Sequence, residues 1–272
     1  MSEIRERLEG RLRSWPAARA LRRRLHGIHV AYREALDRCS RKVQRGLRRW
    51  VYRTPEEVVK SNTKKAFDHF FSQDEFIQTN YLRESRLRFY ECVAEHCVPL
   101  LTSAIDESGR CRVVDMGCGT GHFLLALQRR LGDRAELSGL DFSNAAITRA
   151  RTVVPAASFT VADAYRMPFP DHAFDLVTCV ETLEHLKKPR VALDEMARIC
   201  KPGGHLVITV PDATMDDWGG HVNFWTAGSL KEFLSPLDVG VHDVIGLPEH
   251  GALLAHTSMF ALPTASPYGS RP

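Results

Sequence analysis

Hydrophobic positions in the first fifty residues recur at steps of three and four. The series is Leu21, Leu25, Ile28, Tyr32, Leu36, Cys39, Val43, Leu47 and Trp50. A mean step near 3.6 residues is typical of an amphipathic helix, so the pattern predicts one long helix over residues 17–52. Arginine covers much of its other face, which makes this helix basic as well as amphipathic.

From residue 111 onward, short apolar runs alternate with helix-like stretches. Five runs predict strands, at 112–116, 136–140, 158–161, 174–180 and 205–210. Helices are predicted near 121–131, 143–151, 189–200 and 226–235. Strands that alternate with helices indicate an α/β fold with a doubly wound, mostly parallel sheet. Two last runs, at 239–246 and 257–262, predict a hairpin that brings an antiparallel strand to this sheet.

The hydrophobic pattern and composition together suggest four regions. Residues 1–53 form a basic amphipathic helical arm, and residues 54–104, rich in aromatic side chains, form two or three helices. This second region is either a cap packed by its own rings or a lid over an active site. Residues 105–263 form the α/β domain, and the Pro/Ser/Gly-rich residues 264–272 are expected to be a disordered tail.

Composition excludes several classes of protein. The chain has 272 residues, 44% hydrophobic and 26% charged, which is ordinary for a globular protein. No apolar run approaches the ~18 residues of a membrane span, and the sequence MSEIRERLEG lacks the apolar core of a secretion signal. The seven cysteines include no CxxC pair, which argues against a disulfide scaffold or zinc finger. We therefore expect a cytoplasmic protein.

Charge is divided unevenly along the chain. Residues 1–53 carry 16 Lys and Arg against 5 Asp and Glu, whereas the remainder carries 21 against 28. A basic arm on an acidic body suggests a separate role for the arm. Self-association or packing on the body, and peripheral binding to anionic lipid, are both open for residues 17–52. Nucleic acid is a less favoured partner, because few aromatic residues are interleaved with the arginines to stack bases.

A glycine-rich segment follows the first predicted strand and reads VVDMGCGTGH over residues 113–122. Glycine permits positive φ and lets a ligand approach the backbone, so a strand–glycine loop–helix unit predicts a nucleotide cradle. His122 stands where a dinucleotide fingerprint needs Gly or Ala, and the Gly-Lys-Ser/Thr of a phosphate loop is absent. Asp115 before the loop would repel a pyrophosphate but suits a cationic group.

Two more acidic residues follow the second and third predicted strands. Asp141, 20 residues past Gly121, can accept hydrogen bonds from both hydroxyls of a ribose. Asp163 stands in Ala162-Asp163-Ala164, where it can meet an adenine amino group. The set predicts a cofactor that has ribose and adenine but no phosphate.

Four motifs over residues 105–262 resemble, in order and spacing, the class I S-adenosylmethionine-dependent methyltransferases. They are VVDMGCGTG, LSGLDFS, ADAYRMPFPDHAFDLVTCVETLEHL and KPGGHLVITVP. The resemblance implies a seven-stranded Rossmann-like sheet, S-adenosyl-L-methionine as the cofactor and methyl transfer as the activity. Residues 105–263 would then be a methyltransferase domain.

The same resemblance implies roles for particular residues around the cofactor. Asp115 would lie near its ammonium, Asp141 on its ribose and Phe142 beside its adenine. The remaining implied cofactor-binding residues are Gly117, Cys118, Gly119, Gly121, Asp163, Ala164 and Val180. Tyr81 and Arg88, in the helical region before the domain, are candidate contacts for the carboxylate of the cofactor.

The segment after the fourth predicted strand faces the transferred methyl in this family and reads CVETLEHL over residues 179–186. Its Glu-x-x-Glu-His, followed by KPGGHL, resembles ubiquinone-biosynthesis-type and small-molecule O-methyltransferases. Asn/Asp-Pro-Pro-Tyr/Phe and Pro-Cys are absent, which disfavours base-amine and pyrimidine C5 methylation. His185 is the candidate general base because imidazole titrates near neutral pH, although a structural histidine is an open alternative.

A metal site is a further candidate in the same stretch. Some relatives with Glu-x-x-Glu-His and a later His hold a divalent cation such as Mg²⁺, which would lower the pKa of the acceptor oxygen. The corresponding residues here are Glu181, Glu184, His185 and His221. Many relatives without a metal share the motif, so His221 as a substrate-orienting residue remains open.

The leading functional hypothesis is methyl transfer to a hydroxyl of a small molecule: a polyketide, quinone, sugar or lipid-linked intermediate. One alternative is N-methylation of a small amine. A second is RNA or protein methylation with the Arg-rich arm as the anchor, which predicts salt-dependent binding. A third is a non-catalytic cofactor-binding protein.

Overall fold

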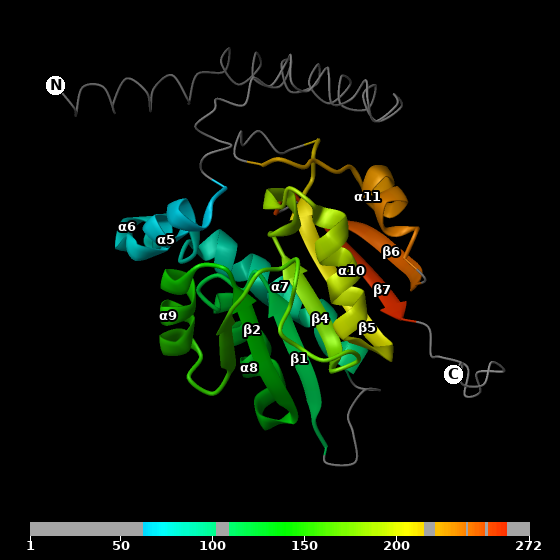
Figure 1. Ribbon diagram of the computed structural model, residues 1–272, viewed down its shortest axis with the longest axis horizontal. Coiled ribbons are helices and arrows are strands. Elements are labelled where there is room, and N and C mark those ends of the chain that lie inside the picture. The colour runs from blue at the N-terminus through cyan, green and yellow to red at the C-terminus, as the bar shows by residue number, and fades with distance from the viewer. Residues whose placement is uncertain (1–61, 102–108, 215–220, 238, 248–249, 260–272) are drawn as a thin grey trace, which may run out of the picture. The chain divides into compact units, whose positions relative to one another are not determined.

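The computed structural model describes residues 62–101, 109–214, 221–237, 239–247 and 250–259 (Figure 1). The chain divides into two units, one of Met1–Arg53 with Ala213–Asp217 and one of Thr54–Asp212 with Trp218–Pro272. Every helix and strand given below belongs to the second unit. The predicted arm helix over 17–52, the start of the helical region at 54–61 and the predicted tail 264–272 lie outside the described residues.

A single seven-stranded sheet forms the centre of the described body, in the order β3-β2-β1-β4-β5-β7-β6. Its strands are β1 (Cys111–Met116), β2 (Ala135–Asp141), β3 (Ser158–Val161), β4 (Phe174–Val180), β5 (Cys200–Pro211), β6 (Val239–Leu247) and β7 (Ala252–Met259). The first five run parallel, and β7 pairs antiparallel with both β5 and β6. This confirms the predicted doubly wound sheet with an antiparallel C-terminal hairpin.

The helices between the strands also fall where the hydrophobic period predicts them. They are α8 (His122–Leu131), α9 (Asn144–Val153), α10 (Pro189–Ile199) and α11 (Ala227–Leu234). Local sequence explains two of the starts, since Ser143 caps α9 by accepting from Ala146 N–H and Pro189 opens α10. Short 3-10 turns occupy Gly132–Arg134 (η1) and Leu183–His185 (η2).

Two strands differ from their predicted bounds by more than one residue. β5 begins at Cys200 rather than at 205, because Phe174 pairs with Cys200 across a bulge in the register of β4 and β5. β7 spans Ala252–Met259 rather than 257–262, so that prediction was wrong. The chain turns at Gly251, which has φ 63°, and pairing with β5 begins at once, with Ala252 opposite Pro211.

The core lies on both faces of the sheet. Alternate strand residues face opposite sides, so Val113 and Leu176 join one apolar cluster while Val114 and Val177 join the other. Helices α8 and α9 complete the first cluster, and α10 and α11 complete the second. Strands buried on both sides in this way explain the continuous apolar runs in the sequence.

Three helices precede β1 among the described residues: α5 (Lys64–Ser72), α6 (Asp74–Asn80) and α7 (Glu84–Leu101). Helix α7 buries Phe89, Val93 and Cys97 in the first core cluster, so it is packed as part of the α/β body. Helices α5 and α6 form a small aromatic cluster and lie beside α9 (Figure 1). Over the described residues, no helix has the length and apolar character needed to cross a membrane.

Candidate active site

The glycine-rich loop leads from β1 into α8 at the carboxyl end of the sheet, where ligands bind in α/β folds. Gly117, Gly119 and Gly121 have φ of 76°, 49° and 80°, values that L-residues with a side chain rarely adopt. The N–H groups of Gly117 and Cys118 both donate to Leu140 O, at 2.8 and 3.0 Å. The loop is therefore held against the end of β2.

Other parts of the protein occupy the space where each loop glycine would carry a side chain. A Cβ on Gly117 would overlap Thr182, and one on Gly119 would lie 3.3 Å from Cε1 of Tyr81. A Cβ on Gly121 would lie 3.3 Å from that of Ala150. These glycines thus allow close packing of neighbouring elements, and their contact with the methionine end of a cofactor remains a prediction. The structure does bring Tyr81 to the loop.

Two buried carboxylates flank the loop. Asp115 is 2% exposed and accepts a 2.7 Å hydrogen bond from Thr178 Oγ1, and burial raises its pKa to about 8. Asp141 is 6% exposed and accepts from Gly119 N–H at 3.0 Å and Ser143 N–H at 2.8 Å. Burial raises the pKa of Asp141 to about 6, against the effect of these hydrogen bonds. A cationic ligand group would offset the cost of ionising these buried carboxyls, whereas a pyrophosphate would add to that cost.

Other predicted cofactor residues take different surroundings. Cys118 and Val180 are buried at the loop and at the end of β4, and Ala164 packs against the second core cluster. Phe142 is partly buried with its ring 5.2 Å from that of Phe67. Asp163 is exposed, and its Oδ1 accepts the N–H of Tyr165 at 2.9 Å. The Asp163 carboxylate therefore stabilises its own turn beyond β3.

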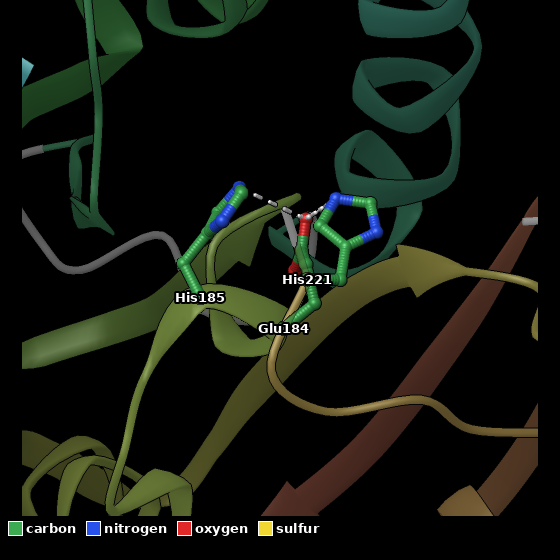
Figure 2. A group of neighbouring side chains, drawn as sticks. All are labelled: Glu184, His185 and His221. Carbon is green, nitrogen blue, oxygen red and sulfur yellow. Dashed lines mark ion pairs between the residues drawn. The ribbon is translucent and has the colours of Figure 1, made fainter. Parts of the chain in front are cut away.

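A second group of polar residues lies on and beside the turn η2. Figure 2 shows Glu184 between the imidazoles of His185 and His221. Glu184 Oε1 lies 3.7 Å from His185 Nε2 and 4.0 Å from His221 Nε2. One ligand atom from each residue lies within 4.8 Å of the others. Two imidazoles and a carboxylate at this spacing are a donor set that can hold a divalent cation and leave a position open.

Backbone contacts bring His221 to this turn from a distant part of the sequence. The N–H groups of Val222 and Asn223 donate to Glu184 O at 2.9 and 3.1 Å. The Asn223 side chain donates to Leu186 O at 2.6 Å. Segment 221–223 is thus tied to η2, which explains why a histidine so far along the chain meets Glu184 and His185.

Glu181, the fourth sequence candidate for a metal ligand, is not part of this group. It has φ 51°, in the left-handed region, and its Oε2 lies 3.5 Å from Nη1 of Arg86 on α7. Burial raises the pKa of Glu181, and the nearby Arg86 and His221 oppose that rise. The structure therefore joins three of the four candidates and directs the remaining carboxylate toward α7.

The arginine near the site is Arg86, whereas the sequence suggested Arg88. The Arg88 side chain is 68% exposed and pairs with Glu84 at 3.2 Å. The Arg86 side chain is 37% exposed, and its Cζ lies 5.5 Å from the centroid of the Phe89 ring. Tyr81 is near enough to raise the pKa of Arg86. Helical spacing could have identified Arg86, since it is three residues before Phe89 on the buried face of α7.

Phe67 of α5 is a second residue that the sequence did not single out. Its ring centroid lies 5.2 Å from that of Phe142 and 5.8 Å from that of His185. Asp68, the next residue, fastens α5 to the start of α9, because its Oδ1 accepts from Ser143 Oγ at 2.7 Å. Phe67 thus lies between the predicted adenine neighbour and the candidate base.

Comparison with known proteins agrees with this geometry. Residues 114–208 match the family model described as a methyltransferase domain. The segment includes β1, the glycine loop and the Glu184–His185 turn. The resemblance to S-adenosylmethionine-dependent methyltransferases that the four motifs predict is therefore confirmed.

Curated relatives are similar over part of their length. The ubiquinone biosynthesis O-methyltransferase of Alkalilimnicola ehrlichii is 38% identical over 105 residues, which are 36% of this chain and 40% of the relative. The 2-methyl-6-phytyl-1,4-hydroquinone methyltransferase of Synechocystis sp. is 34% identical over 125 residues, 45% of this chain and 38% of the relative. The chain thus spans less than half the length of these relatives.

A solved structure supports the fold over a longer stretch. The N-methyltransferase NodS from Bradyrhizobium japonicum, in complex with S-adenosyl-L-homocysteine, is similar with a TM-score of 0.56 and 23% identity. The match covers 73% of this chain and 98% of NodS. At this identity the comparison supports the fold alone, a Rossmann-like sheet flanked by helices.

Proposed function

We propose that the protein is an S-adenosylmethionine-dependent methyltransferase that transfers a methyl group to a hydroxyl of a small molecule. The observation that carries this proposal is the contact between the cofactor loop and the turn that holds the candidate base. Thr182, at the start of η2, donates from Oγ1 to Gly117 O at 3.2 Å. His185, the candidate base, is three residues further along the chain and would therefore lie close to a methyl donor bound at the loop.

The bound cofactor supplies a methyl group on a sulfonium centre, and the chain supplies alignment and proton transfer. Asp141 would hold the ribose, and Asp115 would meet the ammonium of the amino-acid end. Arg86 and Tyr81 would meet its carboxylate, with Arg86 taking the place that the sequence gave to Arg88. His185 would take the proton of the acceptor hydroxyl, and the neighbouring Glu184 would stabilise the resulting imidazolium.

A divalent cation is the finer part of this proposal. Glu184, His185 and His221 would hold the cation, whose positive charge would stabilise the ionised form of an acceptor oxygen. Imidazole ligands favour an ion such as Zn²⁺ over the Mg²⁺ suggested by the sequence resemblance. His185 would then serve as a ligand rather than as the base, so chelation distinguishes the two versions.

Two curated relatives support a quinone-type acceptor, since one is named for O-methylation in ubiquinone biosynthesis and the other for methylation of a hydroquinone. We therefore favour a quinol-like hydroxyl within the predicted small-molecule class. The aromatic side chain of Phe67 beside His185 suits a planar acceptor. A cytoplasmic location, and membrane binding or self-association through residues 17–52, belong to the same proposal.

An acceptor screen tests the proposal. Purified protein is incubated with methyl-labelled S-adenosylmethionine and quinols, catechols, sugars, polyketides and small amines, with Mg²⁺, with Zn²⁺ or with chelator. Label on an oxygen of a small molecule supports the assignment. Label only on amines, or cofactor binding with no transfer to any acceptor class, would contradict it.

A further inference from the structure

We propose that Glu181 is an internal competitor for the carboxylate of the cofactor, so that the Arg86–Glu181 ion pair opens when the cofactor binds. The inference rests on the proposed function, because it takes an S-adenosyl amino acid as the occupant of the glycine loop. It assigns Glu181 a regulatory role within the site rather than membership of the metal-binding group.

The position of Arg86 is the first argument. Its guanidinium comes from α7 and packs over Phe89, which restricts where it can reach. Arg86 neighbours Tyr81, and the Tyr81 ring lies against Gly119 in the cofactor loop. A cationic side chain beside this loop is a suitable partner for a carboxylate. In the structure, the carboxylate that it meets is that of Glu181.

The weakness of the present pair is the second argument. A single contact of 3.5 Å joins Glu181 Oε2 to Arg86 Nη1, longer than the bidentate geometry that an arginine–carboxylate pair can reach. Glu181 Oε1 is buried and lacks a well-formed hydrogen bond to the described residues, although the Thr209 side chain, like Arg86, lowers the pKa of this carboxyl. Glu181 also has the left-handed φ of 51°, which costs free energy for a residue with a side chain. A pair held this way is readily exchanged for a better anion.

The consequence of exchange is coupling between the two halves of the site. Glu181 stands three residues before Glu184, and the charge of His221 already acts on it. Once displaced from Arg86, its carboxylate becomes available to the Glu184–His185–His221 group. Occupation of the donor site would thus change the charge of the acceptor site, and by linkage the effect is reciprocal.

Calorimetric titration of the full chain with two probes tests this idea. S-adenosyl-L-homocysteine carries the amino-acid carboxylate, whereas 5′-methylthioadenosine keeps the nucleoside and lacks the amino-acid end. The variants are Glu181→Gln and Arg86→Gln. The matched controls are Glu84→Gln and Arg88→Gln, which remove the partners of an exposed ion pair on the same helix as Arg86.

Competition predicts that Glu181→Gln binds S-adenosyl-L-homocysteine about threefold more tightly than wild type, since one partly exposed ion pair no longer has to open. Arg86→Gln should bind it about tenfold more weakly. Both variants should bind 5′-methylthioadenosine as wild type does, and both controls should leave the two affinities unchanged. If circular dichroism shows Glu181→Gln unfolded, Glu181→Asp replaces it, and tighter binding is again expected.

Weaker binding of S-adenosyl-L-homocysteine by Glu181→Gln would overturn the proposal, because Glu181 would then be a ligand of the cofactor ammonium. An unchanged affinity, or an equal change with 5′-methylthioadenosine, would also overturn it. If wild type binds S-adenosyl-L-homocysteine and Glu181→Gln does not tighten it, this inference alone fails. If wild type binds neither probe, the proposed function fails with it.

Discussion

Thr182 fills the space in which a side chain on Gly117 would lie, and it donates a hydrogen bond to the Gly117 carbonyl. This contact joins the end of β4 to the end of β1, so the turn that carries Glu184 and His185 is fixed to the glycine loop. The distance between the proposed donor and acceptor sites therefore depends on a glycine and a threonine that need not touch either ligand.

Gly117→Ala should disturb both sites at once. The added methyl would collide with Thr182, and the φ of 76° disfavours alanine. We expect a loss of about 2–4 kcal/mol in the free energy of unfolding, measured by denaturant titration, and weaker cofactor binding. Gly203→Ala is the control, since Gly203 has φ 78° but no atom within 4 Å of an added Cβ, and it should cost about 1–2 kcal/mol. Equal losses in the two variants would show that contact with Thr182 does not matter.

Asp115 should make stability depend on pH in an unusual direction. Its pKa of about 8 in the folded chain lies above the ordinary 3.8, so the unfolded chain ionises first. The folded state is then favoured below about pH 4 and loses this stability as pH rises toward 8. Thermal unfolding of wild type between pH 5 and 8 should show the decline, and Asp115→Asn should reduce it. A decline of the same size in Asp115→Asn would assign the effect elsewhere.

Asp115 should also release a proton when the cofactor binds. A cationic ammonium nearby favours the ionised carboxylate and lowers its pKa. Titration of S-adenosyl-L-homocysteine at pH 7, in buffers of different ionisation enthalpy, should show protons passing to the buffer for wild type and fewer for Asp115→Asn. Binding heats that are the same in every buffer would mean that Asp115 does not sense the ligand.

Phe67→Ala should affect binding more than folding. Phe67 touches Phe142 and His185, whereas Phe70 on the same helix stacks on Phe76 at 5.2 Å and serves as the control. Removal of the Phe67 ring would open the space between Phe142 and His185. We therefore expect faster release of S-adenosyl-L-homocysteine and a KM for the acceptor raised about tenfold. Stopped-flow fluorescence and steady-state kinetics measure the two. The same changes in Phe70→Ala would indicate loss of the whole helix rather than of one contact.

His185→Gln and chelation together test the chemistry of the acceptor site. Loss of the base should lower kcat about 10²- to 10⁴-fold and leave the affinity for S-adenosyl-L-homocysteine near that of wild type. If a cation is bound, chelator should produce the same fall in wild type and His221→Ala should match it. Full activity in chelator would remove the cation from the proposal and leave His185 as the base.

The regular elements could be predicted closely because the central strands are short apolar runs and each helix has its own hydrophobic period. The strand at 174–180 is reproduced to the residue, and the starts of α8 and α9 fall within one residue of prediction. The start of β7 was missed because it depends on a turn at Gly251 and on pairing with β5, both beyond the reach of a local pattern.

Candidate residues were predictable where they lie at the ends of strands and unpredictable where helices bring them in. Asp115 lies near the end of β1, Asp141 ends β2 and His185 follows β4, so topology alone places them at one edge. Phe67 and Arg86 reach that edge because α5 and α7 pack there, and no sequence motif predicts this packing. The contact of Glu181 with Arg86 was likewise unpredictable, because it is an ion pair between residues far apart in the sequence.

The central claim is that the glycine loop, together with Asp115 and Asp141, binds a phosphate-free adenosyl sulfonium compound. Calorimetric titration of the full chain with S-adenosyl-L-methionine, and separately with NAD⁺ as a pyrophosphate nucleotide, tests it most directly. The account predicts saturable binding of S-adenosyl-L-methionine that Asp141→Asn weakens at least tenfold, and no binding of NAD⁺. Binding of NAD⁺ in its place, or binding of S-adenosyl-L-methionine that is indifferent to Asp141, would contradict it.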